Sequence, residues 1–437
     1  MGRSMLLLVS GLVILAGIII ASNNKRAGML PGKSEKSVAE VQARNSSVSL
    51  ITTAIEKLTI DNEWTGSLES GDLLPGEAEL EVYDARSSSY PDGITVGEGG
   101  WDSYKILLYS KATYDGYEVI TEVMMRRDSF SKYSYFSDIE KSTLLGGADI
   151  YFHSKDEITG PVHTNDAFHI SGTPTFYGAV TSPSMWRSRN LLGDNPDFQS
   201  TTDFNSPVKN LPGATQISNL ERSAKTEGLH FDRAIIALFQ SNGSVNIYQY
   251  DYANNVWGSG VNYPASVHKG LISTSREAFV KGKVKGPITL HSKENMEILG
   301  DIEYVDDPRT NPNSTDLLGL VSEKNVIVDK NAHADNGSSD LTLHGSIMAL
   351  GDSFVVEDYN RNGFKGNLNL LGGIIQKSRG PVGTFGSWTG DTGYAKKYNY
   401  DDRLRYSIPP HFPRESVFSI LSWKDRVVNK DDELASN

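Results

Sequence analysis

The 437-residue sequence contains no cysteine, which removes disulfide bonds, thiolate catalysis and cysteine-ligated metal sites together. It also lacks any excess of basic charge: 42 Lys and Arg stand against 54 Asp and Glu, and the formal net charge is −12. We therefore expect no nucleic-acid binding, which needs a basic face. A glycine-rich phosphate loop, a G-x-S-x-G elbow and an H-E-x-x-H pair are absent as well, so nothing points to the chemistries that use them.

What is present is typical of a folded, strand-rich protein. Hydrophobic residues make up 38% of the chain and charged residues 22%, and there are 41 Gly and 20 Tyr. Many glycines and tyrosines favour strands joined by tight turns. The length is sufficient for two or three domains.

The one long apolar run, residues 5–21, reads MLLLVSGLVILAGIIIA and carries no charge. As a helix it would extend roughly 25 Å, slightly less than the hydrocarbon core of about 30 Å. We expect a retained membrane anchor within residues 1–27. The alternative is a secretory signal peptide cleaved after Ala21, where Ala21 and Ser22 supply small side chains.

A second helix is expected over residues 36–60, within a segment of residues 28–62. Its apolar residues recur at spacings of three, four and seven, with Ser37 as N-cap and Glu40 completing a capping box. Three alternating runs follow, at residues 78–83, 104–110 and 117–125, separated by polar turns. They predict a small α+β head over residues 63–145. The apolar residues of the helix are Val38, Val41, Val48, Ile51, Ile55 and Leu58.

The later chain consists of short β-prone pieces, each ended by a Gly, Asp or Asn turn signal. Residues 151–178 contain four of them, at 150–153, 161–163, 168–170 and 175–177. Residues 290–300 (LHSKENMEILG) loosely repeat 152–160 (FHSKDEITG), and 320–328 (LVSEKNVIV) form a weaker copy. Strands this short fit the successive turns of a parallel β-solenoid (β-helix). We expect it over residues 146–380, interrupted by an insertion at 183–265.

The C-terminal segment, residues 381–437, is expected to cap this solenoid. Residues 418–423 (FSILSW) would cover the open strand edge, which otherwise invites aggregation. The fold class predicted from the sequence is therefore mainly β: a hydrophobic and an amphipathic N-terminal helix with a small α+β head, followed by the solenoid.

Several strings resemble a known family. They are residues 160–182 (GPVHTNDAFHISGTPTFYGAVTS), LTLHGSIMALGDSFVVEDYN and LNLLGGIIQKSRGPVGTF within 341–385, and TGYAKKYNYDDRLRYSIPPHFP near the C-terminus. They look like the DUF4900 family of bacterial surface proteins, whose N-terminus is similar to that of PilX-type minor pilins. The resemblance implies insertion in the inner membrane, assembly with pilin or pseudopilin subunits, and no enzymatic activity. Unlike pilins, the chain has Leu7, not Glu, at the fifth position after Gly2.

Polar residues crowd residues 153–169, where the spacing of His163, Asp166 and His169 would share a helical face. Because strands and turns are expected here, we predict turn residues bonded to their own backbone and no metal site or cofactor. The full set is His153, His163, Asn165, Asp166 and His169.

Two acidic groups are candidates for glycoside cleavage, which needs a pair of carboxylates at a set separation. Four aromatic residues of the insertion are candidates for a glycan or protein contact, or for closure of the core: Trp186, Tyr248, Tyr250 and Trp257. No catalytic residue is predicted. The acidic groups are Asp301, Asp306 and Asp307, and Asp352, Glu357 and Asp358.

The function predicted from the sequence is a non-enzymatic structural or adhesion protein of the bacterial cell surface, minor-pilin-like, in a type IV pilus or type II secretion-like assembly. It would be anchored in the inner membrane by its N-terminal helix, with its body periplasmic or extracellular. Its expected partners are pilin or pseudopilin subunits and a surface glycan or protein ligand. The alternative is an exported β-helix enzyme that acts on polysaccharide.

Overall fold

The computed structural model describes residues 31–84, 87–91, 104–190, 193–361, 363–385 and 390–428, without the side chains of 31–35, 73, 335 and 336. The chain divides into two compact units, residues 1–128 with 415–437, and residues 129–414. The predicted anchor at residues 5–21 lies outside the described residues. No helix in the described ranges is both long enough and apolar enough to cross a bilayer.

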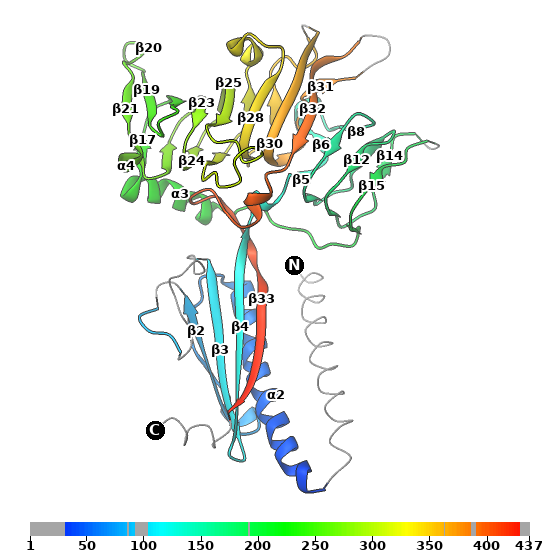
Figure 1. The fold of residues 1–437 in the computed structure, drawn as a ribbon, viewed down its shortest axis with the longest axis vertical. Coiled ribbons are helices and arrows are strands. Elements are labelled where there is room, and N and C mark those ends of the chain that lie inside the picture. Colours follow the sequence, from blue (N-terminus) through cyan, green and yellow to red (C-terminus); the bar gives the residue numbers. More distant parts are fainter. Residues whose placement is uncertain are drawn as a thin grey trace. The chain divides into compact units, whose positions relative to one another are not determined.

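In the first unit, one long helix packs on an antiparallel sheet (Figure 1). The helix α2 (Pro31–Ile60) begins before the predicted residue 36, so Ser37 lies inside it and is not its N-cap. Ile51, Ile55 and Leu58 are buried as expected, whereas Val38 is 46% exposed. The sheet order is β1-β2-β3-β4-β33, formed by β1 (Leu68–Glu69), β2 (Glu77–Asp84), β3 (Lys105–Tyr114), β4 (Tyr117–Ser129) and β33 (Arg414–Val428), with a 3₁₀ turn η1 at Gly71–Leu73.

The three strands predicted at 78–83, 104–110 and 117–125 are confirmed as β2, β3 and β4. Their alternation places Leu80, Leu108 and Val123 in the core beneath α2. The fourth long strand of this sheet comes from the far end of the chain. Residues 418–423, expected to cap the solenoid, lie in β33 next to β4, where Phe418 and Trp423 pack against the core of the first unit.

The second unit is dominated by parallel pairing between short strands, and the prediction of a mainly β chain is confirmed. In what we call the first stack, each strand pairs in parallel with the next. In spatial order it contains β17 (Leu229–Phe231), β22 (Leu271–Thr274), β24 (Pro287–Ser292), β26 (Leu317–Ser322), β28 (Leu341–Ala349), β30 (Phe364–Ser378), β5 (Tyr135–Ile139), β10 (Val162–Thr164), β13 (Val180–Thr181) and β16 (Thr202–Asp203).

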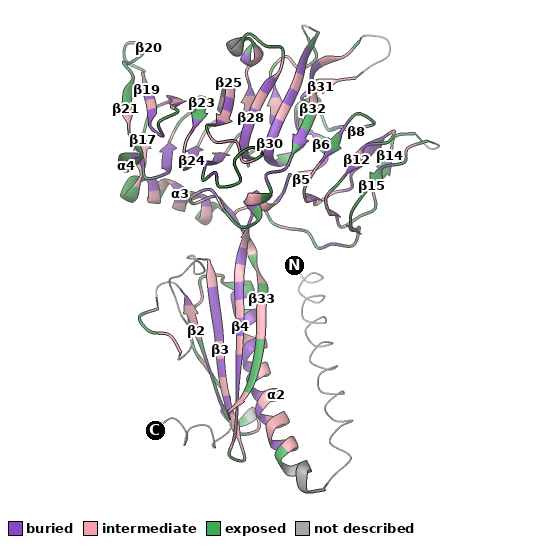
Figure 2. Cartoon of the chain, in the orientation of Figure 1, coloured by how far each residue is buried: buried purple, intermediate pink, exposed green. Residues whose placement is uncertain are grey.

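One column of side chains shows why these residues form a stack. At the same register position, every strand from β22 to β13 carries a buried apolar or aromatic residue (Figure 2). The spacing between neighbours varies from 18 residues, where Leu271 faces Thr289, to 30, where Leu290 faces Leu320. The column runs Ile272, Leu290, Leu320, Ile347, Ile374, Tyr135, Val162 and Val180.

Further parallel ladders accompany the first stack. The second stack contains β18 (Ile235–Phe239), β23 (Ala278–Val284), β25 (Met296–Tyr304), β27 (Val326–Val328) and β29 (Phe354–Val356). A third uses the first halves of β28 and β30, then β32 (Thr392–Asn399), β9 (Glu157–Ile158), β12 (Thr175–Phe176) and β15 (Asp197–Phe198). A separate small sheet joins β8 (Phe152–His153), β11 (His169–Ser171) and β14 (Arg187–Ser188).

The chain enters this unit in the middle of the first stack. Strand β5, the first in sequence, pairs with β10 on one side and with β30, the last of the stack in sequence, on the other. The chain therefore extends from β5 to β16, crosses to β17 and returns to meet β5. Helix α3 (Ala214–Glu227) makes the crossing, with Ile217 and Leu220 packed over Val321 and Met348 of the first stack.

The remaining elements lie within the same unit. Residues 187–203, inside the expected insertion, supply β14, β15 and β16 and continue the parallel pairing. The other elements are β6 (Lys141–Ser142), β7 (Ala148–Asp149), β19 (Val245–Asp251), β20 (Val256–Trp257), β21 (Val261–Tyr263), α4 (Ala265–His268), β31 (Gly383–Thr384) and the 3₁₀ turns η2 (Phe130–Lys132), η3 (Thr143–Leu145), η4 (Ala332–Asn336) and η5 (Asp402–Arg405).

Candidate functional site

Three carboxylates follow one another along the second stack, and we call Glu297, Asp329 and Glu357 the acidic row. Glu297 lies on β25, and the other two come directly after β27 and β29. The backbone N–H of Asp329 donates to Ile298 O at 3.0 Å, and that of Glu357 donates to Val328 O at 2.9 Å. Each residue thus extends the ladder, and neighbouring parallel strands lie about 4.8 Å apart.

The electrostatics of the acidic row separate its members. Burial raises the pKa of Glu297, and the carboxylates of Asp329 and Glu357 raise this pKa further. Asp329 accepts the backbone N–H of Asn331 at 2.6 Å, which favours its ionised form. The only cation that an ion pair gives to the row in the described ranges is Lys330, 3.8 Å from Glu357. A protonated carboxyl beside an ionised one is the arrangement that general acid catalysis uses.

Of the six acidic residues singled out in the sequence, only Glu357 belongs to this row. Asp301 accepts the backbone N–H of Thr342 at 2.8 Å. Asp306 forms an ion pair with Lys285, Asp307 with Arg309 at 2.6 Å and Asp358 with Arg361 at 3.7 Å, while Asp352 accepts a hydrogen bond from Thr143. The two groups that the sequence suggests therefore do not converge, because each carboxylate caps or pairs with its own loop.

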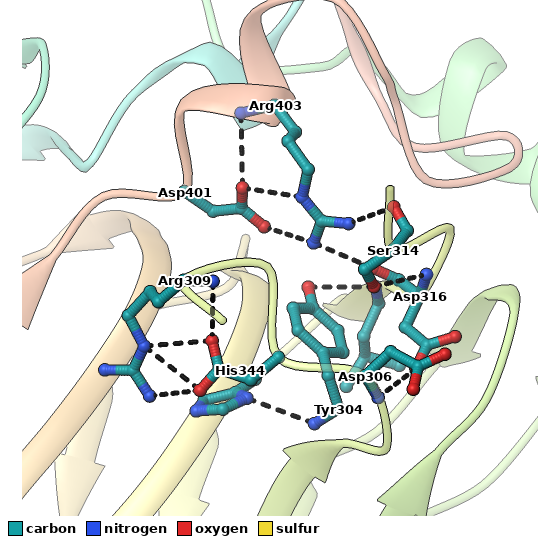
Figure 3. A network of polar contacts seen from close by, with 10 residues as sticks. Tyr304, Asp306, Arg309, Ser314, Asp316, His344, Asp401 and Arg403 are labelled. Atoms are coloured by element: carbon teal, nitrogen blue, oxygen red, sulfur yellow. Dashed lines mark hydrogen bonds and ion pairs between the residues drawn. The ribbon is translucent and has the colours of Figure 1, made fainter. Parts of the chain in front are cut away.

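Asp306 and Asp307 border a polar network between the loop 305–316 and the segment 401–405 (Figure 3). The fully buried carboxylate of Asp316 accepts the N–H groups of Gly286 at 2.7 Å and of Asp306 at 2.8 Å. The guanidinium of Arg403 donates to Asp401, and also to the carbonyl oxygens of Ser314 at 2.7 Å and Asp316 at 2.9 Å. Because these groups satisfy one another, we read the network as structural.

His344 lies at the edge of the same network. Its Nδ1 accepts the backbone N–H of Tyr304 at 3.1 Å, which requires the neutral ring. Burial lowers the pKa of His344 to about 4, and the nearby Arg309 guanidinium adds to this effect. The ring is therefore a neutral hydrogen-bond acceptor at physiological pH.

The polar stretch 153–169 does not form one site. His163 is buried against Phe136, with Nδ1 2.7 Å from Thr181 Oγ1 and Nε2 3.0 Å from Asn165 Oδ1. Asp166 accepts the N–H of Ala167 at 2.8 Å, so this part behaves as the predicted turn.

The other two histidines point elsewhere. His153 stacks on Phe385, and His169 lies between Tyr151 and Asp149, whose Oδ1 is 3.6 Å from His169 Nδ1. Burial lowers the pKa of His169. Among the described residues, no group of three His, Asp or Glu is arranged to hold a metal ion.

The aromatic candidates separate as well. Trp186 packs with the cluster around Phe176 and Val180, whereas Tyr250 and Trp257 face each other across β19 and β20. Tyr248 lies over Gly260, where an added Cβ would be 2.6 Å from its ring. Tyr250 and Trp257 join Tyr252 and Phe279 in what we call the aromatic surface.

Sequence reasoning missed Glu297 and Asp329, although a signal was present. The repeat that relates residues 290–298 to 320–328 is the register of the structure, with Leu290 opposite Leu320 and Met296 opposite Val326. Extending that alignment by one residue reaches Asp329. The proposed third copy misled, because Phe152 lies on β8 and not in the first stack.

Comparisons with known proteins agree with part of the sequence analysis. Residues 108–184 match the family described as "Domain of unknown function (DUF4900)", which confirms that resemblance over this range, from β3 to just beyond β13. A solved structure that resembles the chain is the competence-associated pilin ComZ from Thermus thermophilus, with 12% identity, 90% of this chain and 98% of that chain covered, and a TM-score of 0.33. No curated protein matches the sequence.

Proposed function

We propose that this chain is a non-enzymatic structural or adhesion protein of the bacterial cell surface, a minor-pilin-like component of a type IV pilus or a type II secretion-like assembly. The observation that carries the proposal is the construction of the first unit. An uncharged apolar segment at residues 5–21 precedes helix α2, and α2 packs on one face of an antiparallel sheet. The second unit is inserted into that sheet between β4 and β33.

The second unit is, in this proposal, a parallel β-solenoid for display. The continuous buried column from Ile272 to Val180 supports this description, since each strand buries its inward residue only by pairing with its neighbours. Such a unit grows by repetition and presents a long outer surface. That architecture suits contact with an extended ligand or with neighbouring subunits.

The partners follow from the same construction. The apolar segment would insert in the inner membrane, and the body would be periplasmic or extracellular. Pilin or pseudopilin subunits would contact the N-terminal helix, and a surface glycan or protein would contact the second unit. The net charge of −12 argues against nucleic acid as a partner.

Intact-mass analysis of the native protein from the membrane fraction, sheared surface material and the medium tests this proposal. We expect the apolar segment to be retained and the protein to sit in the membrane or in sheared filaments. A chain that begins near Asn23 and is found only in the medium would refute the anchored, pilin-like reading.

A second candidate function, an exported enzyme that acts on polysaccharide, is favoured by the acidic row. Glu297, with its raised pKa, would donate a proton to the leaving group, and Asp329 would act as base or nucleophile. Release of reducing ends from polysaccharides measures this activity. Glu297→Gln and Asp329→Asn should each abolish it, with Asp307→Asn as the matched control, and no release by the unsubstituted protein would exclude the candidate.

A further inference from the structure

The four rings of the aromatic surface touch one another on the outside of the second unit. Tyr250 lies 5.0 Å from Tyr252 and 5.1 Å from Trp257, and Trp257 lies 5.6 Å from Phe279, as distances between ring centroids. Tyr252 is 53% exposed and Trp257 is 37% exposed. These two side chains do not close the core, so a different reason is needed for a row of large rings in water.

The backbone beneath the rings is well fixed. Tyr250 and Trp257 are direct partners in the antiparallel pair of β19 and β20. In the connecting turn, Asp251 accepts the N–H of Ala253 at 3.0 Å and the side-chain amide of Asn254 at 2.7 Å. The core on the inner side is closed by other residues, Ala237, Val245 and Ile247. The rings are therefore held in place by a hairpin whose inner face is already packed.

The aromatic surface continues into the acidic row. Phe279 on β23 lies directly opposite Glu297 on β25, with parallel pairing between the two strands. Glu297 in turn neighbours the strand that leads to Asp329, and the next strand leads to Glu357. Rings and carboxylates thus follow each other on one side of the second stack, one strand spacing at a time.

We propose that the aromatic surface and the acidic row together form a binding face for a glycan chain of neutral or amino sugars. The C–H faces of sugar rings pack on the exposed aromatic rings, and sugar hydroxyl or amino groups donate hydrogen bonds to Glu297, Asp329 and Glu357. This inference rests on the adhesion part of the proposed function and names its ligand class.

The composition of the face favours a glycan over a protein partner. Protein interfaces are enriched in aromatic residues and arginine but depleted of Glu and Asp at their centre, because buried carboxylates lose hydration. Here the rings lead directly into three carboxylates, and Lys330 is their nearest ion-pair partner among the described contacts. A ligand rich in hydroxyl or ammonium donors satisfies such a face, whereas an acidic polysaccharide is repelled.

Affinity electrophoresis of the full chain, purified in detergent, tests the inference with three probes: hydroxyethyl cellulose, glycol chitosan and polygalacturonate. We expect retardation in at least one of the first two gels and none in the third. Tyr252→Ala and Trp257→Ala should each weaken retardation by roughly tenfold in apparent affinity. Tyr406→Ala is the matched control, since Tyr406 is 81% exposed and lies outside the face.

Unchanged melting curves must accompany the loss in both variants, so that a folding defect is not mistaken for lost binding. No retardation of the unsubstituted protein by either of the first two probes would overturn the inference. Equal retardation of Trp257→Ala, Tyr252→Ala and the unsubstituted protein would also overturn it, as would tight binding to polygalacturonate alone. The assay uses purified protein, so its outcome is independent of the localisation experiment, which tests the proposed function by itself.

Discussion

The guanidinium of Arg379 lies 2.7 Å from the carboxylate of Glu140, which precedes it by 239 residues. Glu140 directly follows β5 and Arg379 directly follows β30, and Arg379 N–H donates to Ile139 O at 2.9 Å. The ion pair therefore sits where the two arms of the second unit meet. Both side chains are almost fully buried, and Arg379 also lies over the ring of Phe152 at 3.7 Å.

Breaking this pair should destabilise the second unit strongly. Glu140→Gln or Arg379→Met alone leaves a buried charge without its partner, for which we expect a loss of about 3–5 kcal/mol in the free energy of unfolding. The double variant should lose much less than the sum. Chemical denaturation of all three measures the coupling.

The control for this cycle is Lys155→Met, which breaks the solvent-exposed pair of Lys155 and Asp391 at 3.4 Å. Its cost should stay within about 1 kcal/mol. Additive losses in the double variant would show that the buried pair is not what joins the two arms.

The first unit should fold without the second. Arg127 Nε donates to Glu415 O at 2.9 Å and Ser419 Oγ donates to Asp128 at 3.0 Å, so β4 and β33 run side by side. Replacing residues 129–414 with Asn-Gly, which favours a two-residue hairpin turn, should leave a cooperative thermal transition. The matched control ends at Asp128 and lacks β33, and it should unfold at a much lower temperature because Phe418 and Trp423 no longer cover the core. Equal melting temperatures for the two proteins would contradict this prediction.

Acid should destabilise the second unit partly through His344. Its pKa is lowered to about 4 in the folded chain, against about 6.5 when unfolded, so protonation favours the unfolded state. The contribution to stability is complete above pH 6.5 and disappears as the pH falls toward 4, on the order of 3 kcal/mol in total. His344→Asn keeps an acceptor for Tyr304 N–H and should flatten this part of the pH profile. His411→Asn, at a half-exposed histidine, is the control and should leave the slope unchanged.

Glu297 should show the opposite slope. Its pKa is raised in the folded chain, so ionisation costs stability once the pH exceeds the unfolded value of about 4.5 and passes through the raised folded value. Glu297→Gln should therefore raise the melting temperature at pH 8 and have little effect at pH 4. Glu303→Gln, at an exposed residue paired with Lys283, serves for comparison and should not be stabilising. A stabilisation by Glu297→Gln that is independent of pH would argue against its proximity to Asp329 and Glu357.

Local patterns predicted the individual elements well. The helix over residues 36–60 follows from apolar spacings of three, four and seven, and α2 buries Ile51, Ile55 and Leu58 accordingly. The short strands at residues 152–176 were expected because Gly, Asp and Asn end each run, and β8 to β12 lie there. Even the register between residues 290–298 and 320–328 was visible as a repeat.

The candidate site was less predictable, because a carboxylate's neighbours depend on strand pairing over about thirty residues. Glu357 was noticed beside Asp352 and Asp358, but its partners are Asp329 and Glu297. Tyr250 and Trp257 were identified as aromatic candidates, while Phe279 joined them only through the packing of the hairpin on β23.

The sequence by itself determined the elements of this protein, because hydrophobic periodicity and turn residues act within a few positions along the chain. Only the tertiary structure decided which edges meet. Backbone hydrogen bonds carry no identity, so β5 offers the same donors and acceptors to β10, 27 residues later at Val162, and to β30, more than 200 residues later. The choice depends on complementary side chains at the join, of which the buried pair of Glu140 and Arg379 is the clearest, and no local pattern records it.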